Sequence, residues 1–200
     1  MSPRLGLRLV ALIVPAALLA PVAAHAEKVV THDPAGDATV VGWLAEEDAE
    51  LPPVPDPSAA DIVRTVAAHG DRRLSITVHF TELAGVRDHS MQVLVRTPSG
   101  AYRVDLDKEE GRRVRSTITR NREAVDCRAL LARYDTGADA VAVSVPTACL
   151  SSPRWVRLGI KAFAPLATTD PAVVASTVDD GHRDTVRLMS VGAGPRIHRG

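Results

Sequence analysis

Alternation of apolar and polar residues across 62–80 constrains the fold of this chain most strongly. Apolar residues occupy nearly every second position on both sides of a turn at Gly70 and Asp71. Such alternation is typical of strands with one buried side and one solvent-facing side. A three-residue loop would set Val66 opposite Ile76, whereas a two-residue loop would set it opposite a polar residue. We therefore expect an antiparallel hairpin with the three-residue loop, because a slip of one residue exchanges the two faces of a strand.

Further alternating segments follow along the chain. Opposed apolar residues favour hairpins at 91–97 with 101–107 and at 130–134 with 141–145, and a polar hairpin at 114–119 with 123–127 is expected at a sheet edge. Single strands are expected at 27–31, 40–44, 154–163 and 172–178, with a helical turn at 147–152. About eight to eleven short strands separated by turns favour an all-β fold, an antiparallel β-sandwich of jelly-roll or immunoglobulin-like type.

The first 26 residues have the pattern of a secretory signal peptide. Arginines precede an apolar run at 9–22, and Ala24-His25-Ala26 fits the small-x-small cleavage pattern. The apolar run contains two prolines and is shorter than the roughly 20 residues needed to span a membrane. We expect cleavage before Glu27 and a secreted, extracellular mature protein.

Charge and length limit the partners and the number of domains. Loss of residues 1–26 takes the net charge from 0 to −2, because two arginines and no acidic residue are removed. A near-neutral chain gives no electrostatic case for nucleic acid or an anionic membrane, so we expect neither as a partner. The remaining length suits one domain, which we place at 27–190 and follow with a flexible tail at 191–200. The composition, rich in Ala, Val, Arg and Asp and poor in Lys, resembles that of high-GC actinobacterial exoproteins.

Cys127 and Cys149 are the only cysteines in the chain. Secretion would place them in an oxidising compartment, where a disulfide is the default. They lie just outside the two ends of the hairpin expected at 130–145 and are nearly equidistant from its turn. A redox or nucleophilic cysteine is not favoured, because no CxxC or Cys/His motif is present.

No catalytic motif is present in the sequence. The nucleophile elbow, the zinc-protease helix, the P-loop and the dinucleotide fingerprint are all missing, and the histidines are scattered. His69 and His79 fall on the expected solvent side of the hairpin. We therefore expect a non-enzymatic protein. The alternative is a small secreted hydrolase, which predicts a cleft joining a histidine to a carboxylate or a serine.

Aspartates in the expected turns form the one candidate site. Asp33 and Asp37 flank Pro-Ala-Gly, Asp61 precedes the hairpin, and Asp180 follows the last long strand. Calcium takes about six to eight oxygen ligands from carboxylates and carbonyls, and acidic turns containing glycine supply both. These four aspartates are expected to bind calcium if their loops meet at one end of the sandwich. Since aspartate also favours turns for local reasons, ordinary turns are the alternative.

The order of these features carries a family resemblance. Asp33-Pro-Ala-Gly-Asp37, a Pro-rich stretch and the alternating strands from Asp61 to Phe80 resemble the start of DOMON-like and related carbohydrate-binding β-sandwich modules. The resemblance covers residues 33–82. It implies a sandwich, calcium near the first acidic turn in some members, and a sugar or haem ligand in others.

The chain departs from the sugar-binding members in its aromatic residues. It has only two Trp, two Tyr and two Phe, whereas those modules bind sugars on exposed aromatic side chains. Trp43, beside the first acidic turn, is the remaining candidate for a ligand platform. The leading expectation is a secreted, non-enzymatic binding or interaction module of unknown ligand. A carbohydrate-binding domain is the alternative, and it predicts an exposed Trp43.

Overall fold

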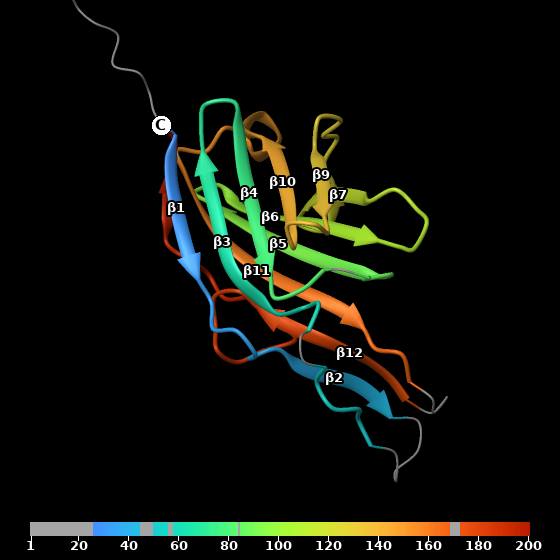
Figure 1. The fold of residues 1–200 in the computed structure, drawn as a ribbon. Coiled ribbons are helices and arrows are strands. Elements are labelled where there is room, and N and C mark those ends of the chain that lie inside the picture. Colours follow the sequence, from blue (N-terminus) through green and yellow to red (C-terminus); the bar gives the residue numbers. More distant parts are fainter. Residues whose placement is uncertain (1–25, 45–49, 56–57, 84, 169–172) are drawn as a thin grey trace, which may run out of the picture.

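Two antiparallel sheets packed face to face make up the computed structural model, which describes residues 26–44, 50–55, 58–83, 85–168 and 173–200. The strands of one sheet cross those of the other at a large angle (Figure 1). The predicted β-sandwich is confirmed. The only helical element among the described residues is the turn η1 (Thr147–Leu150), at the predicted place. No helix in the described part of the chain has the length and apolar character needed to cross a membrane.

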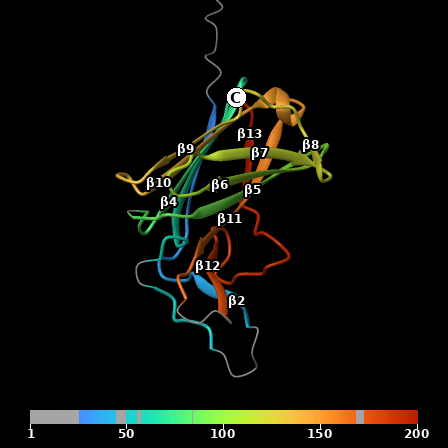
Figure 2. The same ribbon diagram turned by 90° about the vertical axis from the view of Figure 1, so that its right-hand side faces the viewer.

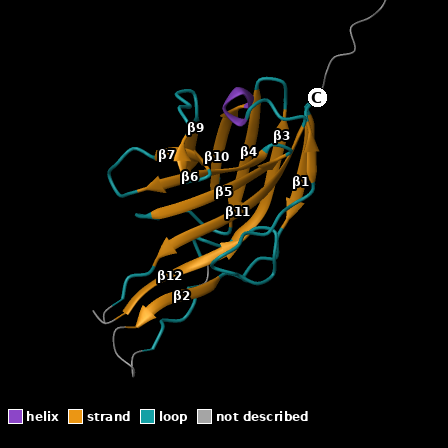
Figure 3. Cartoon of the chain, turned by 180° about the vertical axis from the view of Figure 1, so that it is seen from behind, coloured by secondary structure: helices purple, strands orange, loops and turns teal. Residues whose placement is uncertain are grey.

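Sheet A contains five strands. In spatial order they are β1 (Glu27–His32), β3 (Ile62–His69), β4 (Arg73–Phe80), β10 (Ala140–Pro146) and β9 (Leu131–Asp135). Sheet B lies behind sheet A in Figure 1, and Figure 3 views its outer face. Its order is β2 (Thr39–Leu44), β12 (Val173–Asp180), β11 (Trp155–Pro165), β5 (His89–Thr97), β6 (Gly100–Lys108), β7 (Arg115–Arg120) and β8 (Glu123–Ala124), and β13 (Arg196–His198) also pairs with β11.

The core lies between the sheets and is built from alternate residues of each strand. The predicted hairpin of β5 and β6 is confirmed in its register, with Val93 opposite Val104. The hairpin of β9 and β10 is confirmed as well, with Tyr134 opposite Val141. Buried valine, leucine and isoleucine side chains from β4, β10 and β11 complete the core. Burial of this apolar surface is the main favourable contribution to folding.

The register predicted for the β3–β4 hairpin holds at Ile62, which lies opposite Phe80, but is wrong by one residue from Arg64 onward. The loop consists of two residues after Gly70, whose N–H donates to the carbonyl of Arg73 at 3.0 Å. Val66 therefore lies opposite Thr77 and not opposite Ile76. A bulge near the start of β3 shifts the alternation, since an extra residue reverses the faces of all that follow. His69 consequently faces the core and is buried.

The predicted flexible tail at 191–200 is also wrong. Arg196–His198 forms a strand against β11, and Ile197 belongs to the hydrophobic core. The N–H of Gly200 donates to the carbonyl of His69 at 3.2 Å, so the segment is hydrogen-bonded to its end. The strand expected at 172–178 runs on to Asp180, which moves Asp179 out of a turn and into a sheet.

The predicted disulfide between Cys127 and Cys149 is confirmed, with Cα atoms 5.8 Å apart. It joins the segment that follows β8 in sheet B to η1, which follows β10 in sheet A. The bond therefore ties the connection between β8 and β9 to the end of β10. Its presence is compatible with an extracellular location.

Removal of this disulfide should lower the stability of the protein. For Cys127→Ser combined with Cys149→Ser, we expect the free energy of unfolding to fall by about 3 kcal/mol, because the unfolded chain loses a cross-link. This corresponds to a melting temperature roughly 6–12 °C lower, measurable by calorimetry. Equal melting temperatures for the variant and the oxidised protein would contradict a structural role.

Candidate metal centre

The turn between β1 and β2 carries the first two aspartates of the site. Asp33 directly follows β1, and its N–H donates to the carbonyl of Val63 at 3.1 Å. Gly36 adopts a positive φ of 85°, which glycine accepts without strain. The turn therefore folds back and brings Asp37 next to Asp33 at the start of β2.

Asp61 holds this turn from the other side. Both of its carboxylate oxygens accept the N–H of Gly36, at 3.0 and 2.9 Å. The hydroxyl of Thr81 donates to the same carboxylate. Asp61 is buried, and both of its carboxylate oxygens are engaged by these donors. Its role is therefore to position the Asp33–Asp37 turn.

Asp179 reaches the same place from the end of β12. It lies opposite Ala162, a buried core residue of β11, and so points into the sandwich. Its exposed fraction is 0%, and one oxygen accepts the N–H of Ile62 at 2.8 Å. The other oxygen accepts the N–H of Asp180 at 2.6 Å. The strand order β2-β12-β11 brings this carboxylate beside the β1–β2 turn.

Asp33, Asp37 and Asp179 converge. One carboxylate oxygen from each lies within 4.8 Å of the other two. Two oxygens bound to one calcium ion at its usual bond lengths lie up to about 5 Å apart, so the spacing suits calcium. The donor set consists of carboxylate oxygens only, which hard cations prefer over transition metals. The chemistry and spacing of these three carboxylates fit a calcium ion, which would need further oxygen ligands to complete its usual six to eight.

Three carboxylate oxygens of this cluster are buried without a hydrogen-bond donor among the described residues. They are Oδ2 of Asp33 and both oxygens of Asp37. A buried polar atom left without a partner costs about 1–3 kcal/mol, and a charged one costs more. None of the three clustered aspartates forms an ion pair with a lysine or arginine in the described part of the chain. The cluster therefore lacks a positive charge.

The electrostatic consequence appears in the pKa values. Burial, followed by the charges of Asp179, Asp37 and other acids, raises the pKa of Asp33 to about 8. Burial raises the pKa of Asp179 to about 7, although the N–H of Ile62 acts against the rise. The pKa of Asp37 is raised by burial and then by Asp61. Deprotonation of all three near neutral pH is therefore unfavourable without a cation.

The structure brings together some of the predicted ligands and separates another. Asp33 and Asp37 meet as expected, and Asp61 supports them from a buried position. Asp180 points the other way, because it lies opposite Lys161 on the outer side of β11. Its two oxygens accept the N–H of Gly192 at 3.1 and 2.8 Å.

Asp179 and Asp180 both belong to the acidic stretch expected after the last long strand, and Asp180 was predicted as the ligand, although a signal that favours Asp179 exists in the sequence. If strand β12 is continued beyond residue 178, alternation places Ala175, Thr177 and Asp179 on one side. The appearance of Asp-Asp-Gly at 179–181 instead favoured a turn. The structure resolves this choice, since the strand ends only after Asp180.

The prediction that Trp43 is a ligand platform is not tested by the structure. The backbone of Trp43 lies in β2, opposite Val174, but its side chain lies outside the part of the chain that the structure describes.

An open groove near the cluster is lined by His32, His182, Asp33 and Asp184, among others. No hydrogen bond joins either histidine side chain to a carboxylate in the described residues, so the hydrolase alternative stays a hypothesis.

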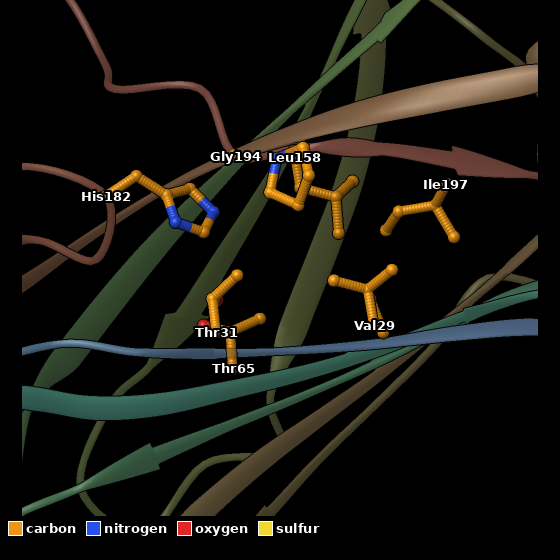
Figure 4. Close-up of a pocket in the computed structure, with 9 residues that line it drawn as sticks. Val29, Thr31, Thr65, Leu158, His182, Gly194 and Ile197 are labelled. Atoms are coloured by element: carbon orange, nitrogen blue, oxygen red, sulfur yellow. The ribbon is translucent and has the colours of Figure 1, made fainter.

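A small cavity lies between β1, β3 and the C-terminal segment (Figure 4). Its polar lining consists of the hydroxyls of Thr31 and Thr65 and Nε2 of His182, all buried and without a partner among the described residues. Its volume is about 10 Å³, close to the space of one water molecule. It is therefore too small for the sugar or haem ligands that the family resemblance implies.

Comparisons with protein-family models, with curated proteins and with solved structures give no match.

The raised pKa values predict an unusual pH dependence of the cation-free protein. Asp33 and Asp179 bind protons more tightly when folded than when unfolded, so stability falls as pH rises from about 4 to about 8. Burial lowers the pKa of His69, His89 and His182, which acts in the opposite direction but only below their ordinary pKa of 6.5. Between about pH 7 and 8.5 the histidine effect has largely faded, whereas the pKa of Lys161, lowered by burial, still acts against the effect of the acids. Comparison with a variant that lacks one of the acids therefore isolates their contribution.

We therefore expect the melting temperature in chelator to be lower at pH 8.5 than at pH 7. Asp33→Asn, which removes the charge and keeps the shape, should abolish most of this decrease. Thermal unfolding followed by circular dichroism provides the measurement. A constant or rising melting temperature across this window would contradict the raised pKa values.

Proposed function

We propose that this chain is a secreted, non-enzymatic binding module whose β-sandwich is stabilised by a calcium ion bound to Asp33, Asp37 and Asp179. The signal-peptide pattern at 1–26 supports the secreted location. The disulfide is compatible with that location.

One observation carries the calcium proposal. Buried carboxylate oxygens of Asp33 and Asp37 have no hydrogen-bond donor among the described residues, and they meet a third carboxylate, that of Asp179. Such an arrangement is costly for an isolated chain, because like charges repel and desolvation is not compensated. A divalent cation removes both costs, since it neutralises the charges and takes the free oxygens as ligands.

The position of the cluster explains what the cation would do. Asp33 follows β1 of sheet A, Asp37 precedes β2 of sheet B, and Asp179 lies in β12 of sheet B. An ion held by all three would link the two sheets at the point where the chain crosses between them. Its role in the proposal is structural, and ligand binding is assigned to other parts of the surface.

Calcium should raise the melting temperature of the purified, oxidised protein. At about 100 times the dissociation constant, binding to the folded state alone adds about 2.7 kcal/mol. This corresponds to a rise of roughly 5–10 °C over the value in chelator. Asp37→Asn should abolish this rise. In chelator at pH 8, the same variant should have a higher melting temperature than the natural protein, because one of the mutually repelling charges is lost.

The matched control is Asp126→Asn, which changes an aspartate whose side chain is 77% exposed. It should keep the full calcium effect. A calcium effect that Asp37→Asn leaves intact, or no calcium effect at pH 8, would refute the cation site.

Asp179 and Asp180 offer a sharper test, because they are neighbours with different roles. Asp179→Asn should abolish the calcium-dependent rise, since it removes a ligand. Asp180→Asn should keep that rise and instead lower the stability by about 1–3 kcal/mol in calcium and in chelator alike, because a buried acceptor facing Lys161 is weakened. Loss of the calcium response in both variants would contradict the assignment of ligands.

A further inference from the structure

A buried lysine fixes the loop that precedes β13. Lys161 of β11 is 1% exposed and lies on the outer side of sheet B. Its ammonium donates to the carbonyls of Arg187, Leu188 and Ser190, at 2.6, 3.3 and 2.9 Å. Hydrogen bonds from a charged donor are stronger than neutral ones. The backbone of 187–190 is therefore held against the sheet at three points.

The same loop presents its apolar side chains to solvent. Leu188 is 61% exposed and Met189 is 99% exposed. Figure 2 shows that the segment between β12 and β13 projects from sheet B on the side away from sheet A. Single exposed apolar residues are common, but here two adjacent ones stand on a loop with a fixed backbone. This pair, Leu188 and Met189, is called the apolar tip below.

Arginines collect on the same outer side of sheet B. Arg157 of β11 lies directly opposite Arg96 of β5, and on its other edge directly opposite Arg196 of β13. Neighbouring strands are about 5 Å apart, so the three residues form a row across three strands. Like charges directly opposite each other destabilise a sheet. None of the three forms an ion pair with an acidic side chain in the described part of the chain.

The contacts of this arginine row leave charge available. Arg157 donates to the carbonyls of Gly194 and Ala193, at 2.9 and 3.3 Å, which do not neutralise it. The guanidinium of Arg196 stacks over the ring of Trp155 at 4.6 Å. Arg96 is exposed. Arg187, exposed beside the apolar tip, adds a fourth positive charge.

Acidic side chains near this surface are engaged, lie at its margin or stand away from the arginine row. Asp107 of β6 is exposed on the same side, opposite Ser90 and Arg115, toward the other end of these strands from Arg96. Asp180 is buried beneath the loop and bonded to Gly192. On β6, Asp105 pairs with Arg103 at 2.8 Å. Asp184 is exposed but lies close enough to Asp33 and Asp37 to raise their pKa values, which places it toward the cation cluster. The arginine row itself contains no acid.

We propose that this outer face of sheet B docks on an anionic lipid surface, with the apolar tip entering the interface and the arginines contacting lipid phosphates. An apolar element surrounded by basic residues is what an anionic membrane selects. A soluble polyanion such as an acidic polysaccharide would use the arginines but leave the apolar tip exposed. The near-neutral net charge of the chain predicted no membrane partner. Net charge is a sum over the whole chain, however, and does not reveal that arginines are concentrated on this one face.

The inference goes beyond the cation site and uses none of its residues. It also stands if calcium has no effect on stability. Conversely, a calcium-dependent melting temperature with no lipid binding would support the cation site and reject this surface.

Vesicle co-sedimentation tests the proposal. The purified protein is mixed with vesicles of phosphatidylcholine alone and of phosphatidylcholine with phosphatidylglycerol, at low and at high salt. We expect binding to the anionic vesicles, weaker binding to the neutral ones, and release by salt, because screening weakens interactions with exposed arginines. The natural protein and all variants have the same N-terminal end, so any lipid binding by that end is the same in each. Differences in binding between them therefore come from the outer face of sheet B.

Two double variants separate the parts of the surface. Arg96→Gln with Arg187→Gln should weaken anionic-vesicle binding roughly 30-fold, since each arginine near an anionic surface contributes about a fivefold factor. Leu188→Ser with Met189→Ser should weaken it roughly tenfold or more, because apolar surface no longer leaves water. A melting temperature equal to that of the natural protein would show that each variant keeps the fold.

The control changes the same residue types on the opposite sheet. Leu131 is also 61% exposed, and Arg133 lies two residues away on β9. Leu131→Ser with Arg133→Gln should bind vesicles like the natural protein. Equal binding by the apolar-tip variant, no binding to anionic vesicles at low salt, or binding only to soluble dextran sulfate would overturn the proposal.

Discussion

The side of the sheet on which each side chain lies is the constraint on which this structure depends. Consecutive residues of a strand point to opposite faces, so a displacement of one residue moves a side chain from the interior to the surface. In β12 this rule sends Asp179 inward toward the acid cluster and Asp180 outward toward Lys161. Two consecutive residues therefore differ in their surroundings: the carboxylate of Asp179 lacks a positively charged partner, whereas that of Asp180 faces Lys161. The same rule sets the arginine row on the outer side of sheet B.

Much of the fold follows from the sequence because short turns fix the register locally. The hairpins of β5 with β6 and of β9 with β10 have the expected cross-strand pairs, since both strands of each keep an unbroken alternation. Alternation fails at β3 because a bulge between Ile62 and Arg64 reverses the faces after it. The apolar residues of 62–68 fit either face, so the sequence favours the wrong one. His69 is buried as a result of this single irregularity.

The candidate site is harder to predict because its parts are distant in the chain. Asp33 and Asp37 share one turn, and their proximity follows from that turn alone. Asp179 joins them only because β2 pairs with β12 and because the N–H of Ile62 holds its carboxylate. Sheet order of this kind is not encoded in local alternation or turn residues. The arginine row has the same origin, since β5, β11 and β13 are distant in sequence.

The distribution of charge links these two regions. A chain whose net charge is near zero can pair most of its acidic side chains with basic ones. Here three aspartates instead gather inside the sandwich, and arginines gather on the outer side of sheet B. Both arrangements oppose folding, since buried carboxylates lose hydration and opposed arginines repel. Natural proteins keep such costs where a ligand offsets them, and ligands of opposite charge suit the two regions. A divalent cation among the aspartates would also make the whole chain less negative, which reduces its repulsion from an anionic surface.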